Sequence, residues 1–146
     1  MRITQEADYA LRITYLLARQ SEVLDAGSIA KAVGVTESFT LKILRKLSSA
    51  GLLRSKKGVN GGYELAVPTN EVSMRRVIET IDGPVEISRC LSGDYVCSRV
   101  GSCKNECAFH CIFGKLNVQL AEKLDSVTLD VILSDGFDIN NYLEKI

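Results

Sequence analysis

Two helical stretches, separated by a glycine and followed by a glycine-rich hairpin, constrain the fold of this chain more than any other feature. A short helix is predicted over residues 29–33, with Ser28 as its N-cap and Gly34 in the left-handed position that ends a helix. Thr36 is expected to cap a longer helix over residues 37–50. This succession is typical of a helix-turn-helix, whose second helix enters the major groove of DNA.

A hairpin is predicted directly after these helices. Two strands, residues 52–55 and 63–67, flank the loop Lys56-Lys57-Gly58-Val59-Asn60-Gly61-Gly62. A hairpin in this position is a wing, and lysines at its mouth can reach an adjacent groove or the phosphates. The loop lacks the strand-to-helix context and the Lys-Ser/Thr ending of a nucleotide-binding P-loop. The sequence therefore predicts a winged helix.

The basic residues are concentrated in this same part of the chain, although the net charge at pH 7 is zero. Residues 1–64 contain ten Lys and Arg against six Asp and Glu. Between Ser38 and Tyr63 no acidic residue occurs at all. A local basic patch is the electrostatic footprint of a phosphate-backbone partner, so double-stranded DNA is the predicted partner. A solvated helix face is the alternative that charge alone leaves open.

The predicted DNA contacts come from the two helices and the wing. Base edges are expected to meet the first turn of the second helix, and phosphates its later cations. The apolar positions Phe39, Ile43, Leu44, Leu47 and Ala50 are expected to face inward. The predicted DNA-binding residues are Ser28, Thr36, Ser38, Phe39, Thr40, Lys42, Arg45, Lys46, Lys56, Lys57, Gly58 and Gly61.

All five cysteines and the only histidine lie between Cys90 and Cys111. Thiolates and imidazole are the ligands that hold zinc or iron–sulfur clusters. Cys103, Cys107 and Cys111 have the close spacing that zinc prefers, whereas Cys90 and Cys97 do not. Spacing alone leaves zinc and iron–sulfur equally open. A metal-free thiol switch is a third possibility, because cysteines this close can form disulfides on oxidation.

A long helix is predicted from about Glu106 to Asp125. Its apolar positions Phe113, Leu116, Leu120 and Leu124 recur every three or four residues. On the periphery of a small domain such a stripe would be exposed, and the usual remedy is a twin helix from a second subunit. A homodimer is therefore expected, with these four residues in its interface.

The chain of 146 residues is expected to be mainly α with one small β-hairpin. Residues 1–68 are predicted to form the winged helix-turn-helix domain, beginning with a helix capped by Thr4. Residues 69–146 are predicted to form a helical dimerisation region with a cysteine-rich sensor loop at residues 90–111. The N-terminus does not read as a signal peptide, and no stretch approaches the roughly 20 apolar residues of a membrane span. A cytoplasmic protein without membrane contact is expected.

Several motifs together resemble the Rrf-type winged-helix transcriptional regulators, a family that includes iron–sulfur cluster regulators and nitric-oxide sensors. The motifs are Met1-Arg-Ile-Thr4, Asp8-Tyr-Ala-Leu-Arg12, Lys57-Gly-Val-Asn-Gly-Gly-Tyr-Glu-Leu65, Val77-Ile-Glu-Thr-Ile-Asp82, Cys90-x6-Cys97-x5-Cys103 and Thr128-Leu129. The resemblance implies a homodimer that binds a palindromic operator and carries one cluster per subunit near the dimer helix. It also implies that Lys57 stands where the family has an arginine that enters the minor groove.

The resemblance implies two alternative sets of cluster ligands. In the forward register, Cys90, Cys97 and Cys103 are the three cluster cysteines. In the backward register, Cys107 and His110 match the family's last cysteine and its Cys-x2-His partner. Both cannot hold without an insertion of about four residues, which leaves Cys107, His110 and Cys111 as further or replacement ligands. Asp8 matches an aspartate that the other subunit supplies as fourth ligand in the nitric-oxide sensors.

The sequence thus predicts a transcription factor of the repressor type, whose operator affinity is controlled by a two-iron or four-iron cluster or by a redox or nitric-oxide signal at the cysteine-rich loop. No constellation for hydrolysis occurs, so catalytic activity is not expected. A zinc- or thiol-based sensor is the alternative. An electron-transfer or scaffold protein is a rival from another class, but the acid-free basic stretch argues against it.

Overall fold

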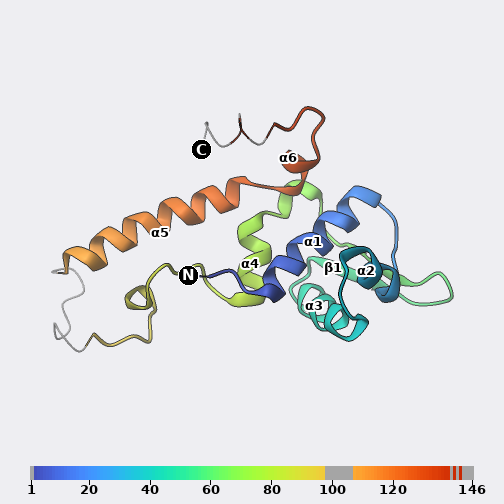
Figure 1. The fold of residues 1–146 in the computed structure, drawn as a ribbon, viewed down its shortest axis with the longest axis horizontal. Coiled ribbons are helices and arrows are strands. Elements are labelled where there is room, and N and C mark those ends of the chain that lie inside the picture. Colours follow the sequence, from blue (N-terminus) through green and yellow to red (C-terminus); the bar gives the residue numbers. More distant parts are fainter. Residues whose placement is uncertain (1, 98–106, 139, 141, 143–146) are drawn as a thin grey trace.

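A computed structural model describes residues 2–97, 107–138, 140 and 142 of the chain. The architecture is mainly helical with one hairpin, as the sequence predicted (Figure 1). The elements in chain order are α1 (Gln5–Gln20), α2 (Ala26–Val33), α3 (Glu37–Ser49), β1 (Leu53–Lys56), β2 (Gly62–Leu65), the 3₁₀ turn η1 (Thr69–Glu71), α4 (Met74–Asp82), the 3₁₀ turn η2 (Arg89–Leu91), α5 (Ala108–Ser126) and α6 (Leu129–Leu133).

Helix α1 lies at the centre of the molecule. Thr4 caps it as predicted, because the Thr4 hydroxyl accepts the N–H of Ala7 at 3.2 Å. The same threonine joins α1 to the end of α4, since its backbone N–H donates to the Asp82 carboxylate at 3.0 Å and its hydroxyl donates to the second carboxylate oxygen. The N-terminus of α1 is thereby joined to the C-terminal end of α4.

The helix-turn-helix consists of α2 and α3. Thr36 caps α3 and Gly34 ends α2 with φ of +76°, as predicted. The predicted cap of α2 was wrong. Helix α2 begins at Ala26, and Asp25 rather than Ser28 is its N-cap, with the Asp25 carboxylate accepting the Ser28 N–H at 2.9 Å. Aspartate and serine are both good caps, and the earlier one gives the longer helix.

The wing is an antiparallel pair in which Leu53 faces Leu65 and Lys56 faces Gly62. Its second strand also makes an isolated bridge from Tyr63 to Leu24, in the segment before α2. A Cβ at position 62 would collide with the Leu24 carbonyl, so glycine is required for this close approach. The hairpin is therefore fixed to the helix-turn-helix and not merely appended to it.

One hydrophobic core joins the winged helix to the segments that follow it. Ile13 and Leu17 of α1 meet Ile43 of α3 in a cluster that also includes Val77 of α4 and Leu129 of α6. The predicted domain boundary at residue 68 stays a prediction, but residues before and after it pack in the same hydrophobic core.

Helix α5 leaves this core and extends along one side of the molecule (Figure 1). Its predicted start at Glu106 lies outside the described residues, and its end at Ser126 is one residue beyond the prediction. Asn117 holds the helix to the preceding segment by donating to the Val85 carbonyl at 2.8 Å and accepting the Ile87 N–H at 2.9 Å. In the described part of the chain, no helix combines the length and the apolarity that crossing a membrane requires.

Candidate DNA interface and cysteine segment

The outer face of α3 is polar and exposed, and the opposite face is buried. Successive residues of an α-helix are about 100° apart, so positions 38, 42, 45 and 49 share one face. Ser38, Lys42, Arg45 and Ser49 are all exposed. The opposite face carries the fully buried residues Thr40, Ile43, Leu44 and Leu47. The second helix of the motif thus presents two cations and two hydroxyls to solvent.

Two of the predicted contacts on α3 pack into the protein instead. Thr40 is completely buried, and its hydroxyl donates to the Thr36 carbonyl at 3.1 Å. Phe39 is half-buried and packs edge to face on Tyr9 of α1, with ring centroids 5.8 Å apart. Ala50, which was expected inside, is exposed. Compared with the prediction, the buried face of α3 is rotated away from Ala50 and toward Thr40. Because the Thr40 side chain is buried, it cannot reach a base edge.

The hydroxyls of Ser28 and Thr36, near the starts of α2 and α3, already form hydrogen bonds within the protein. The Ser28 hydroxyl donates to Asp25 at 2.6 Å, and this bond together with the Ser28 N–H lowers the pKa of the Asp25 carboxyl below its ordinary value. Thr36 accepts the Phe39 N–H at 3.4 Å while remaining exposed. Both side chains are at the surface, as predicted for contacts, but each also has an internal role as a cap or cap partner.

Lys42 and Lys46 of α3 share one carboxylate, that of Glu6 in α1. Lys42 Nζ lies 2.9 Å from one Glu6 oxygen and Lys46 Nζ lies 2.8 Å from the other. Burial by itself would raise the pKa of Glu6, but hydrogen bonds from Lys46 and Lys42 and their positive charges outweigh it and lower the pKa. The sequence alone does not reveal this contact, since nothing local marks a pairing between residues so far apart in the chain.

A second shared carboxylate lies on the wing. Glu64 of β2 pairs with Arg54 of β1, directly opposite in the ladder, and with Lys56 at 3.1 Å. Hydrogen bonds from Arg54 and Lys56 lower the pKa of the Glu64 carboxyl. Arg45 and Lys57, by contrast, form no ion pair with any residue that the structure describes. These two are the unneutralised cations of the basic stretch.

The tip of the wing depends on its glycines. Gly58 has φ of +110°, which side chains rarely adopt, and a Cβ on Gly61 would collide with the Lys56 carbonyl. Val59 between them is fully exposed. Gly58 and Gly61 were predicted as DNA contacts, and their demonstrable role is to shape a turn that presents Lys57 and Val59.

The cysteine segment is only partly described, because Cys103 lies outside the described residues. Cys90, Cys97 and Cys107 are half-buried, and Cys111 is exposed. Cys107 is the residue before α5, and its carbonyl accepts the Cys111 N–H at 3.0 Å. His110, half-buried, belongs to the same first turn. Within the described ranges, no three metal-ligating side chains come together.

The residues present still fit a thiolate-rich metal centre by their chemistry. The described cysteines are accessible at least in part, and the segment holding Cys90 lies against α5, where Leu91 is close to Gly114. Asp8, the remaining ligand candidate, forms an ion pair with Arg12 at 2.9 Å on α1. Both side chains are about half exposed, so the carboxylate is reachable from outside.

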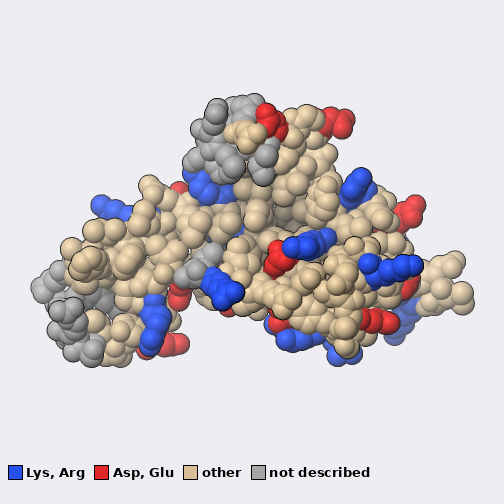
Figure 2. Space-filling model, viewed as in Figure 1, with Lys and Arg blue, Asp and Glu red and all other residues tan. Residues whose placement is uncertain are grey.

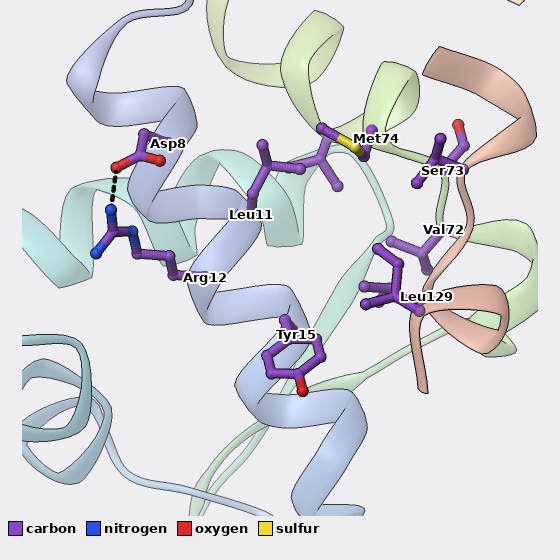
Figure 3. A pocket seen from close by; sticks show the side chains of 11 residues that line it. Asp8, Leu11, Arg12, Tyr15, Val72, Ser73, Met74 and Leu129 are labelled. Atoms are coloured by element: carbon purple, nitrogen blue, oxygen red, sulfur yellow. Dashed lines mark ion pairs between the residues drawn. The ribbon is translucent and has the colours of Figure 1, made fainter. Parts of the chain in front are cut away.

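Asp8 and Arg12 lie at the rim of an open apolar groove, shown in Figure 3. The groove has a volume of about 230 Å³. Its floor is formed by Leu11 and Tyr15 of α1 together with residues of the segments around α4 and α6. Sequence reasoning missed it, because it is assembled from three elements that are distant in the chain.

The helix-turn-helix, the hairpin after it and the exposed cationic face of α3 define a winged-helix transcription factor. The sequence matches the Rrf2 family, described as iron-dependent transcriptional regulators, over residues 3–135. The chain therefore belongs to the Rrf2 family.

Several known proteins are similar to this chain. Protein aau3 of Rhizobium meliloti is 35% identical over 105 residues, which cover 70% of this chain and 68% of that protein. The HTH-type transcriptional regulator IscR of Vibrio cholerae is 26% identical over 140 residues, covering 93% and 77%. The solved structure of CymR, the global cysteine regulator of B. subtilis, has a TM-score of 0.71 at 24% identity and covers 89% of this chain and 94% of CymR.

The different surroundings of Ser38 and Thr40 give a direct test of how α3 is oriented. Ser38→Ala should change the preferred DNA sequence, at about 1–3 kcal/mol for each lost base contact, and leave thermal stability unchanged. Thr40→Val should leave the sequence preference unchanged and lower the free energy of unfolding by roughly 1 kcal/mol, because one hydrogen bond is lost. Selection from a duplex library and thermal unfolding measure the two effects. The reverse pattern would mean that another face of α3 meets the DNA.

Proposed function

We propose that this protein is a homodimeric, operator-binding regulator whose DNA affinity responds to the state of its cysteine segment. The observation that carries the proposal is the joint exposure of α3 and the wing. Ser38 and Arg45 lie on the outer face of α3, and Lys57 lies at the mouth of the glycine-shaped wing. In a winged helix these surfaces meet the major groove and the flanking backbone or minor groove.

The wing assignment is tested by the salt dependence of DNA binding. Each neutralised phosphate contributes a slope of about −0.9 to the dependence of log affinity on log salt. Lys57→Ala should weaken binding and flatten this slope by about one contact if Lys57 meets a phosphate, or shift the preference beside the half-site if it reaches the minor groove. Lys115→Ala, an exposed lysine on α5, is the matched control. If Lys57→Ala and Lys115→Ala had the same effect on DNA affinity and on its salt dependence, the wing would not be part of the DNA interface.

Dimerisation is supported by an uncovered apolar face on α5. Phe109, Ile112 and Leu116 are exposed by 70%, 53% and 48%. Together with the half-buried Phe113 and Leu120 they form a stripe along the helix. Three of the four predicted interface residues, Phe113, Leu116 and Leu120, lie in this stripe, and the fourth, Leu124, is half-buried further along α5. Figure 2 shows that the surface over α5 carries few charges. A stripe of this kind is suited to a second copy of the same helix about a twofold axis.

The dimer proposal has a matched pair of variants on α5. Leu116→Glu places two carboxylates in the proposed seam and should give monomers at micromolar concentration. Val118→Glu introduces the same charge at a side chain that is 55% exposed on the opposite face, so it should leave the dimer intact. Sedimentation velocity distinguishes the two outcomes. A monomeric wild-type protein, or equal effects of both changes, would contradict the proposal.

For the sensor, we propose that Cys90, Cys97 and Cys103 hold an iron–sulfur cluster. A bound cluster would supply a centre that responds to oxidants and reductants. The chain's own contribution is positional. Asn117 and the Leu91–Gly114 approach hold the segment around Cys90 against α5, so a change at the thiolates would be passed to the proposed dimer helix. Asp8 or His110 is the proposed fourth ligand.

A zinc- or thiol-based sensor is the second candidate. Cys107 and Cys111 lie one helical turn apart at the start of α5, a spacing at which two thiolates can share one zinc ion. The same pair can also be oxidised together when the segment is exposed to oxidants.

Five single Cys→Ala variants, reconstituted anaerobically with iron and sulfide, separate these candidates. The forward register predicts loss of visible absorbance for Cys90→Ala, Cys97→Ala and Cys103→Ala, with little loss for Cys107→Ala and Cys111→Ala. The backward register predicts that Cys107→Ala is as damaging as Cys90→Ala. Equal losses at all five positions, with zinc in the purified protein, would favour the second candidate.

A further inference from the structure

Glu6 of α1 is a carboxylate placed within the basic surface of α3. Its side chain is 16% exposed, and each of its two oxygens contacts a different lysine of α3, Lys42 at 2.9 Å and Lys46 at 2.8 Å. Thr4, two residues earlier, is bound to Asp82 at the end of α4. The first turn of α1 is therefore held firmly beside α3, and Figure 1 shows α1, α3 and α4 grouped at this end of the core.

The two lysines differ in what they would otherwise do. Lys42 lies in the middle of the outer face of α3, between Ser38 and Arg45. Its side chain is 59% exposed, so its ammonium would be available to a phosphate were it not turned toward Glu6. Lys46 is less exposed, and its Nζ also lies 3.5 Å from the Ile81 carbonyl. Glu6 thus competes with DNA for the most centrally placed cation of α3.

We infer that Glu6 limits the sequence-independent part of DNA binding: it withholds Lys42 and Lys46 from the phosphate backbone and so lowers affinity for DNA of any sequence. Phosphate contacts strengthen binding to every duplex and carry no sequence information, whereas base contacts distinguish one sequence from another. With two cations held internally, Arg45 and Lys57 remain for phosphates, and base contacts such as the one proposed for Ser38 supply a larger share of the total binding free energy. The inference rests on the proposed function, because it presumes that α3 meets DNA.

The test is the salt dependence of binding to a 30-base-pair duplex of mixed sequence, measured by fluorescence anisotropy. Glu6→Gln keeps the shape of the side chain and removes its charge. It should tighten binding to this duplex several-fold at moderate salt and steepen the slope by about 0.9 to 1.8, as one or two lysines become available. Glu122→Gln on α5 makes the same change of net charge away from α3 and should leave the slope unchanged.

A second set of variants decides the question even if Glu6→Gln is unstable. If Glu6 withholds the lysines, Lys42→Gln and Lys46→Gln should flatten the wild-type slope less than Arg45→Gln, which removes a cation without an ion pair to any described residue. Equal flattening by all three would overturn the inference, as would a Glu6→Gln slope equal to that of the wild type. A wild-type protein with no salt-dependent binding to any duplex would instead reject the proposed function.

Discussion

The buried face of α1 is the constraint on which the rest of the structure depends. Helices α2, α3, α4 and α6 and the second wing strand all pack on this helix. Ala7 and Ala10 allow close approach at its N-terminal end, and Ile13 and Leu17 fill the core beyond them. Burying one such aliphatic side chain contributes about 1.5–3 kcal/mol, against about 0–1 kcal/mol for an exposed ion pair. Packing on α1 therefore sets where α3 lies, and the ion pairs act on an arrangement that is already determined.

Local signals in the sequence were sufficient for most of the fold. Thr4 and Thr36 cap the helices that they were predicted to cap, because an N-cap needs only a side-chain oxygen and the N–H two or three residues ahead. The cap of α2 was predicted wrongly. Asp25 and Ser28 are both competent and lie three residues apart, so local chemistry alone does not select between them.

The functional surface was less predictable for a related reason. The outer face of α3 follows from helical periodicity, but the predicted core face included Ala50, which is exposed, and left out Thr40, which is buried. The pairing of Glu6 with Lys42 depends on how α1 and α3 cross, and no pattern within either helix contains that information. For the cysteines the reverse holds. The sequence alone shows which chemistry they can perform, whereas how all five are grouped does not follow from the described residues, because Cys103 lies outside them.

The two hydrogen bonds of Asn117 have a consequence for how the cysteine segment behaves. They fix Val85 and Ile87 beside Asn117 of α5, and the chain enters the same helix at Ala108, about 14 Å away along its axis. Much of the entropic cost of closing this loop is therefore already incurred when the rest of the chain folds, whatever the loop binds. If the cysteine segment binds a group, as proposed, gain or loss of that group acts on a segment of about 20 residues whose two ends are already fixed on α5, so it need not involve unfolding of the core around α1.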